Sequence, residues 1–122
     1  MKKYFAIIIL LVATTGFAQQ RYSQTFDVKA YAEQQTEMIQ SALDLDQATT
    51  GKVYQANLAK AHALHKWILL AEKRNKVQGK TLKEVLQEVN TDAERSAGYQ
   101  KSMQHILGEE LYQKYLEKFP RK

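Results

Sequence analysis

Apolar residues recur at steps of three and four along most of the chain after residue 26, which is the period of an amphipathic α-helix. No segment alternates apolar and polar residues for long enough to predict a β-strand. Asp27 is a good N-cap residue, so the first helix is predicted to run from Asp27 to about Ala42. Its stripe, interrupted only by the polar Gln35, consists of Val28, Tyr31, Met38, Ile39 and Ala42.

A second helix is predicted from about Gln47 to Val77, after a break in the pattern at the letters LDLD. At 1.5 Å per residue it would be roughly 45 Å long, which is unusual for so small a chain. Its inward stripe is predicted to consist of Tyr54, Leu58, Ala61, His65 and Ile68, with Val53, Leu64 and Leu69 beside it.

The third helix has a clear start signal. Thr81 is followed three residues later by Glu84, which is the capping-box pattern, so a helix is predicted to begin at this point. Its apolar positions continue to Leu107. Gly98 lies inside this helix, where glycine costs about 1 kcal/mol relative to alanine, so Gly98 is predicted to mark a bend or a close approach.

Gly108 is predicted to end or kink the third helix, and a short last helix follows until Pro120 stops it. The sequence therefore predicts an all-α fold of four helices with a long antiparallel helical hairpin. Such a hairpin leaves one apolar face poorly covered unless a client protein or a second copy of the chain packs on it. A homodimer is accordingly among the expected arrangements.

The first residues have the three-part pattern of a bacterial secretory signal peptide. Lys2 and Lys3 precede an uncharged run over 5–15, and small residues lead to an expected cleavage between Ala18 and Gln19. The run is shorter than the roughly 20 residues that a membrane-spanning helix needs, so no stable membrane insertion is expected after cleavage. The expected organisation is a signal peptide over 1–18, a flexible leader over 19–26 and a single helical domain over 27–122, in a periplasmic or secreted protein.

Composition excludes several classes of chemistry. The chain has no cysteine, which removes disulfides, thiol catalysis and thiolate metal sites. The formal net charge is +5, but the basic residues, Lys60 among them, are scattered between Glu and Gln except at 72–76. A nucleic-acid partner would need a denser basic face with interleaved aromatic residues, so these charges are interpreted as solvated helix faces.

The stretch SALDLDQATTGKVY over 41–54 is interpreted as a helix start. Asp44 and Asp46 fit the first two ligand positions of a calcium loop, but Ala48 stands where the third acidic ligand would be. A phosphate-binding loop is also excluded, because only the pair Gly51-Lys52 matches and no strand precedes it. Asp46 is therefore predicted to be the N-cap of the long helix.

His62 and His65 are the candidate metal ligands, because residues three apart on a helix lie on the same side. Met38 or His105 could complete the site. The alternative is that these histidines pack along an amphipathic helix. No serine or carboxylate stands in a catalytic motif, so the protein is not expected to be an enzyme, and no cofactor is expected.

Two segments resemble one repeated unit. The segments LDLDQATTGKVYQ (43–55) and ILGEELYQKYL (106–116) each contain a leucine, a short polar break and then a helix with aromatic residues and lysine. Both resemble the repeated LTxxQ motif of the Spy/CpxP-like family of small exported helical proteins. At Asp46 an aspartate replaces the capping threonine of the motif. The positions that match the motif are Leu43, Leu45, Ile106, Leu107, Glu110, Tyr112, Lys114, Tyr115 and Leu116. Thr49 and Leu111 stand where that motif has glutamine.

The resemblance implies a curved, helical, dimeric periplasmic protein. It would bind unfolded or apolar protein clients without ATP, or act as an envelope-stress or metal-sensing accessory. Three functions follow as hypotheses: a chaperone-like or stress-adaptor binding protein, a metal sensor that uses His62 and His65, and a structural module that docks to one envelope protein.

Overall fold

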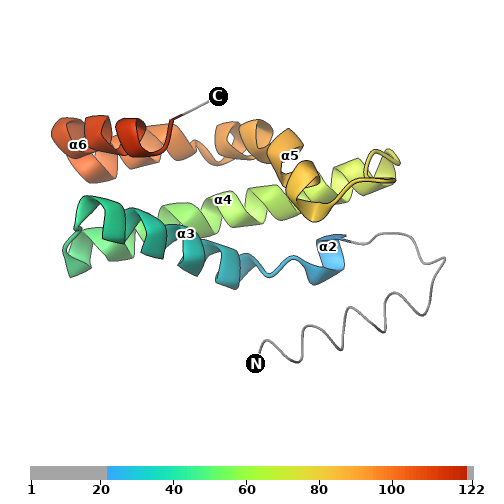
Figure 1. The fold of residues 1–122 in the computed structure, drawn as a ribbon, viewed down its shortest axis with the longest axis horizontal. Helices are drawn as coiled ribbons and strands as arrows, with labels where there is room; N and C mark the ends of the chain where they lie inside the picture. The colour runs from blue at the N-terminus through green and yellow to red at the C-terminus, as the bar shows by residue number, and fades with distance from the viewer. Residues whose placement is uncertain (1–21, 121–122) are drawn as a thin grey trace.

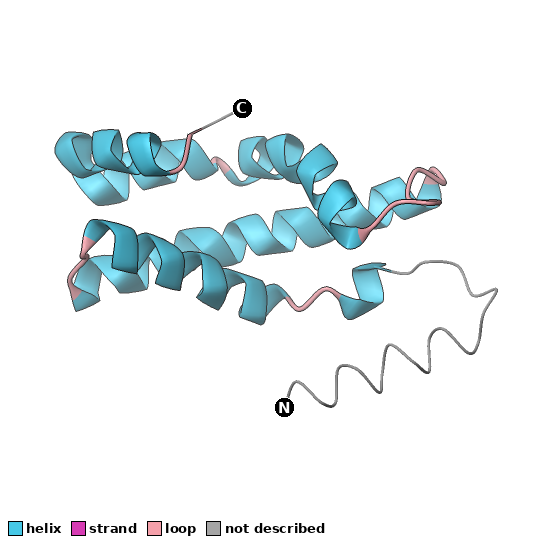
Figure 2. Ribbon diagram, in the orientation of Figure 1, coloured by secondary structure: helices cyan, strands magenta, loops and turns pink. Residues whose placement is uncertain are grey.

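The computed structural model describes residues 22–120, and these residues form helices joined by short loops, with no strand among them (Figures 1 and 2). The predicted all-α fold is therefore confirmed. The predicted signal peptide and the cleavage site at Ala18–Gln19 lie outside the described residues. None of the helices in 22–120 is long and apolar enough to cross a membrane. The helices are α2 (Tyr22–Thr25), α3 (Val28–Leu43), α4 (Gln47–Lys73), α5 (Leu82–Ala97) and α6 (Tyr99–Lys118).

Side-chain caps start three of the helices, as the sequence predicts. The carboxylate of Asp27 accepts a hydrogen bond from the N–H of Ala30 at 3.0 Å, and that of Asp46 accepts from Thr49 at 2.7 Å. At α5 the Glu84 side chain accepts from the N–H of Thr81 at 2.8 Å while the Thr81 hydroxyl accepts from the N–H of Glu84 at 3.2 Å. Each cap binds otherwise unpaired N–H groups of a first helical turn.

The long helix α4 ends at Lys73, before the predicted Val77. Asn75 adopts a left-handed conformation with φ of 56°, and the N–H of Lys76 donates to Ala71 O at 2.8 Å. This 6→1 bond is the mark of a Schellman cap, and asparagine tolerates the left-handed region better than most residues. The chain then turns back and buries Val77.

The buried face of α4 differs from the predicted stripe by a small rotation. Of the predicted inward residues, Ala61 and Ile68 are fully buried, whereas Tyr54, Leu58 and His65 are half-buried. Leu69 is exposed. The buried face instead consists of Val53, Asn57, Lys60, Ala61, Leu64 and Ile68. Two of these residues are polar, which is why the apolar pattern alone indicates a different face.

Gly98 separates α5 from α6, so the third helix does not continue to Leu107 as predicted. With φ of 62°, Gly98 is the C-cap of α5 and the N-cap of α6 at once. A Cβ atom built on Gly98 would have no neighbour within 4 Å. The glycine therefore makes a bend, and the alternative of a close approach is wrong.

Gly108 interrupts α6, as predicted, and the chain reverses its direction there (Figure 1). Its φ of 78° and ψ of 168° lie in a region that is essentially restricted to glycine. In a straight helix Gln100 and Tyr112 would be about 18 Å apart along the axis. Their side chains instead form a 3.0 Å hydrogen bond, so the second part of α6 folds back on the first.

Replacing Gly108 with alanine is expected to lower the free energy of unfolding by about 1–3 kcal/mol, because alanine is strained in that region. Gly51 is a matched control: it lies within α4, has no positive φ, and a Cβ there would meet nothing within 4 Å. Gly51→Ala is expected to stabilise the protein by up to about 1 kcal/mol. Urea unfolding of both variants measures this, and equal effects would contradict the reversal at Gly108.

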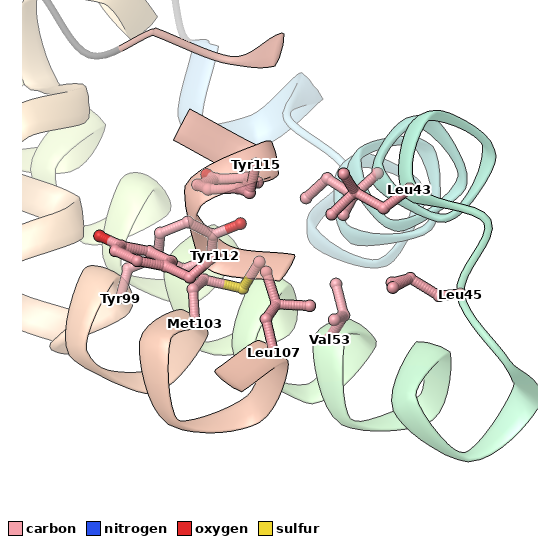
Figure 3. Packing of buried hydrophobic residues seen from close by; sticks show 9 residues of the cluster. Leu43, Leu45, Val53, Tyr99, Met103, Leu107, Tyr112 and Tyr115 are labelled. Carbon is pink, nitrogen blue, oxygen red and sulfur yellow. The ribbon is translucent and has the colours of Figure 1, made fainter. Parts of the chain in front are cut away.

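Two hydrophobic clusters form along α4, which runs between α3 and the α5–α6 pair in Figure 1. Among the described residues only two large apolar side chains, Met38 and Leu69, are exposed. The apolar faces of the hairpin are therefore covered by α5 and α6 of the same chain. The first cluster contains Ile39, Leu43, Leu45, Val53, Tyr99, Met103, Leu107, Tyr112 and Tyr115 (Figure 3), and the second contains Leu64, Ile68, Val77, Val85, Val89 and Ala93.

Part of the segment predicted as a flexible leader is structured. Residues 22–25 form the helical turn α2, and Ser23 is buried against α4 through hydrogen bonds to Glu72. The polar composition of this segment suggested solvent exposure, but its serine and its two aromatic residues have partners far away in the sequence.

Candidate functional site

A cleft of about 540 Å³ opens between α3 on one side and α5 and α6 on the other, with α4 contributing the buried Lys60. This volume lies within the range of about 300–1,000 Å³ that is usual for ligand pockets. The walls carry amide, hydroxyl and aromatic groups together. The lining residues are Gln35, Ile39, Lys60, Gln87, Asn90, Thr91, Glu94, Gln100, Tyr115, Phe119 and Pro120.

A buried ion pair lies in this cleft. The Nζ atom of Lys60 is 3.3 Å from Oε2 of Glu94, and the two side chains are only 7% and 14% exposed. The ammonium group also lies over the ring of Tyr99, 4.5 Å from its centroid, and 5.9 Å from the ring centroid of Tyr31. Two aromatic faces and one carboxylate therefore replace part of the water that the ammonium loses.

Amide side chains hold the carboxylate of Glu94. Asn90 donates to Oε2 at 3.0 Å and Gln100 donates to Oε1 at 3.2 Å. Gln100 in turn accepts a hydrogen bond from the hydroxyl of Tyr112. Both carboxylate oxygens thus have donors, and three residues from α5 and α6 fix the orientation of Glu94.

A second chain of buried hydrogen bonds crosses α4 beside the ion pair. The hydroxyl of Tyr99 donates to Asn57 Oδ1 at 2.6 Å, and Asn57 Nδ2 donates to the hydroxyl of Thr36 at 2.9 Å. Within residues 22–120 no buried side-chain nitrogen or oxygen lacks a partner. The polar groups therefore form a satisfied layer that links α3, α4 and α6.

Burial changes the acid–base properties of the layer. It lowers the pKa of Lys60, and the neighbouring Glu94 carboxylate opposes that change. Burial also raises the pKa of Tyr31 to about 12 and raises the pKa values of Tyr99 and Tyr115. In each case the low-polarity surroundings disfavour the charged form of the side chain.

The predicted metal ligands do not converge. His62 is exposed, and the Nε2 atom of His65 lies 2.9 Å from the carbonyl oxygen of Ser23. In the described part of the chain, no group of three or more His, Cys, Asp or Glu residues has the geometry to hold a metal ion. Met38 and His105 are both exposed. Metal binding by His62 and His65 stays a prediction that zinc and copper calorimetry can test.

The residues of the two motif copies meet in the first hydrophobic cluster (Figure 3). Leu43 and Leu45 from the first copy share this cluster with Leu107, Tyr112 and Tyr115 from the second. Ile106 and Leu116 pack against it, whereas Glu110 is exposed and Asp46 caps α4. Apart from Tyr115, none of these residues lines the cleft, so their arrangement indicates packing.

The polar residues of the cleft were not predicted from the sequence. Lys60 was interpreted as part of a solvated face, but the residue is only 5% exposed. One signal in the sequence could have indicated it: Val53, Asn57, Lys60, Leu64 and Ile68 follow one another at steps of three and four. Polar residues at such positions in an otherwise apolar stripe indicate a buried polar layer.

Comparison with known proteins leaves the chain without an assigned family. No protein-family model, no curated protein and no solved structure matches it. The geometry of the cleft is therefore the main basis for a functional assignment.

Proposed function

We propose that the protein is a non-enzymatic binding protein of the periplasm, chaperone-like or an envelope-stress adaptor, whose cleft binds an extended segment of another protein. The observation that supports this most is the combination of amide and aromatic groups in a cleft of about 540 Å³. The resemblance of the two motif copies to the Spy/CpxP-like family agrees with this proposal.

Amide side chains suit the binding of a polypeptide backbone. A glutamine or asparagine side chain both donates and accepts hydrogen bonds, as a peptide group does. Gln35 on α3 and Gln87 on α5 line opposite sides of the cleft. Hydrogen bonds from these side chains to a bound backbone would not depend on the sequence of the client, which a chaperone-like protein requires.

Apolar groups in the same cleft suit the side chains of a partly unfolded client. Ile39, Tyr115 and Phe119 all line it. Phe119 is half-buried and supplies the accessible apolar surface, whereas Ile39 and Tyr115, which are 2% and 6% exposed, form the wall behind it.

Substituting the two glutamines is expected to weaken client binding without unfolding the protein. Each neutral hydrogen bond contributes about 0.5–1.5 kcal/mol, so Gln35→Ala/Gln87→Ala should lower client affinity about tenfold. Light scattering of a reduced, aggregating client measures the protein concentration that is needed to suppress aggregation. The matched control is Gln34→Ala/Gln104→Ala, which makes the same change at exposed positions of α3 and α6 that do not line the cleft.

Absence of suppression by the unchanged protein at equimolar concentration would exclude the chaperone-like form. Equal loss of suppression in the cleft variant and in the control variant would exclude the cleft as the site. Suppression of several unrelated clients indicates a chaperone, whereas one dominant partner recovered from an envelope extract, without general suppression, indicates an adaptor.

A further inference from the structure

Ser23 of α2 is bound by α4 through all of its polar groups. Its backbone N–H donates to Glu72 Oε2 at 3.0 Å, and its hydroxyl donates to Glu72 Oε1 at 2.6 Å. The Nε2 atom of His65 lies 2.9 Å from the carbonyl oxygen of Ser23, and because a carbonyl only accepts, the ring N–H donates. His65 and Glu72 are about two turns apart on one face of α4.

Aromatic side chains flank this serine on both sides. The hydroxyl of Tyr22 donates to the carbonyl oxygen of Lys80, in the loop that follows α4. Tyr22 and Phe26 both pack against the second hydrophobic cluster, and the ring of Phe26 lies 5.4 Å from that of Tyr31. The contacts thus define a short pattern: an aromatic residue, serine, two unrestricted residues and a second aromatic residue.

The position of α2 depends on these contacts. A single helical turn of four residues is not stable in water by itself, because helix nucleation is unfavourable. Only Phe26 and Asp27 connect α2 to α3. The groups of α4 and of the following loop therefore act on α2 as a binding site acts on a short peptide.

We propose that His65, Glu72 and the carbonyl of Lys80 form a recognition site for short segments of the pattern aromatic–Ser–x–x–aromatic. The segment of α2 occupies this site within the chain, and a segment of the same chemistry from a partner protein replaces it. The Glu72 carboxylate selects serine, because a residue without a hydroxyl leaves Oε1 without its donor. None of these residues lines the cleft, so the site does not depend on the function proposed for the cleft.

An emptied site allows a direct test. In Tyr22→Ala/Ser23→Ala/Phe26→Ala the internal segment loses both rings and the hydroxyl, whereas His65 and Glu72 are unchanged. The probe is an acetylated, fluorescein-labelled peptide with the sequence of residues 22–28, YSQTFDV. Fluorescence anisotropy is expected to show saturable binding to this variant with a Kd near 0.1 mM, about −5.5 kcal/mol. The unchanged protein should bind at least about tenfold more weakly, because its own segment competes at a millimolar effective concentration.

Two further changes test the recognition itself. Adding Glu72→Gln to the emptied variant, or replacing serine with alanine in the peptide, is expected to weaken binding at least about tenfold, since a charge-assisted hydrogen bond contributes roughly 1.5–3 kcal/mol. Glu117→Gln, at an exposed position of α6, is the matched control and should leave binding unchanged.

The proposal is overturned if the folded variant shows no saturable binding below about 1 mM, or binds equally well after Glu72→Gln. Circular dichroism establishes folding. Should the triple variant not fold, Ser23→Ala alone is the second background, and it should bind the peptide more tightly than the unchanged protein does. Equal binding by these two proteins would also overturn the proposal.

Discussion

Lys60→Met is expected to lower the free energy of unfolding by about 3 kcal/mol, the lower end of the range for breaking a buried ion pair. The substitution keeps most of the apolar stem but leaves the Glu94 carboxylate, only 14% exposed, without its cation. The lower end applies because Asn90 and Gln100 still donate to this carboxylate. Urea unfolding monitored by circular dichroism measures the change.

A second substitution separates the lost ion pair from lost packing. In Lys60→Met/Glu94→Gln no charge remains, while the new amide oxygen can still accept from Asn90 or Gln100, so about 2 kcal/mol should be regained. Lys66→Met, at an exposed position of α4, is the control and should change stability by less than about 0.5 kcal/mol. If Lys60→Met has no larger effect than Lys66→Met, the ion pair of Lys60 and Glu94 is solvated and the cleft contains no buried charges.

Above about pH 10, the free energy of unfolding is expected to fall steeply as pH rises. Burial raises the pKa of Tyr31 to about 12 and raises those of Tyr99 and Tyr115 above the ordinary value of 10.0. The unfolded chain therefore loses these protons first, so their stabilising contribution is complete below pH 10 and decreases as pH rises toward the folded-state values. Each tyrosine contributes up to about 1.4 kcal/mol per pH unit, and the three together up to about 4.

Lys60 has the opposite effect on the pH dependence of stability, at lower pH values than the tyrosines. Because its pKa in the folded protein is below the ordinary 10.5, the unfolded chain binds the proton more tightly, and stability rises with pH until about 10.5. Urea unfolding at a series of pH values, with tyrosinate absorbance as the second signal, measures both intervals. Tyr31→Phe should reduce the alkaline slope by about one third. An unchanged slope in that variant, or ordinary tyrosine titration in the folded protein, would contradict the expectation.

Local signals explain why much of the helical plan was predictable. Asp27, Asp46 and the Thr81–Glu84 pair cap helices through residues only three positions away, so a short window of sequence contains the whole interaction. Gly108 breaks its helix because of its own backbone conformation. The early end of α4 was harder to predict, because it also depends on Val77 packing back against the second cluster.

The candidate site depends on contacts that no local pattern contains. Lys60 is buried because Glu94, 34 residues away, supplies a carboxylate, and Asn57 because Tyr99, 42 residues away, donates to it. Without those partners, both residues resemble the polar side of a helix. The segment of α2 is a similar case, since Ser23 and Glu72 are separated by 49 residues.

The division into two clusters has a consequence for partial unfolding. The residues of α6 that are buried belong to the first cluster and those of α5 to the second, and these helices meet at the bend at Gly98 and through the hydrogen bond from Gln100 to Glu94. Between the clusters lies the polar layer, so no single apolar cluster extends over both ends of α4. The protein can therefore open in two steps, with α2, α5 and the second half of α4 as one cooperative unit and the remaining helices as the other.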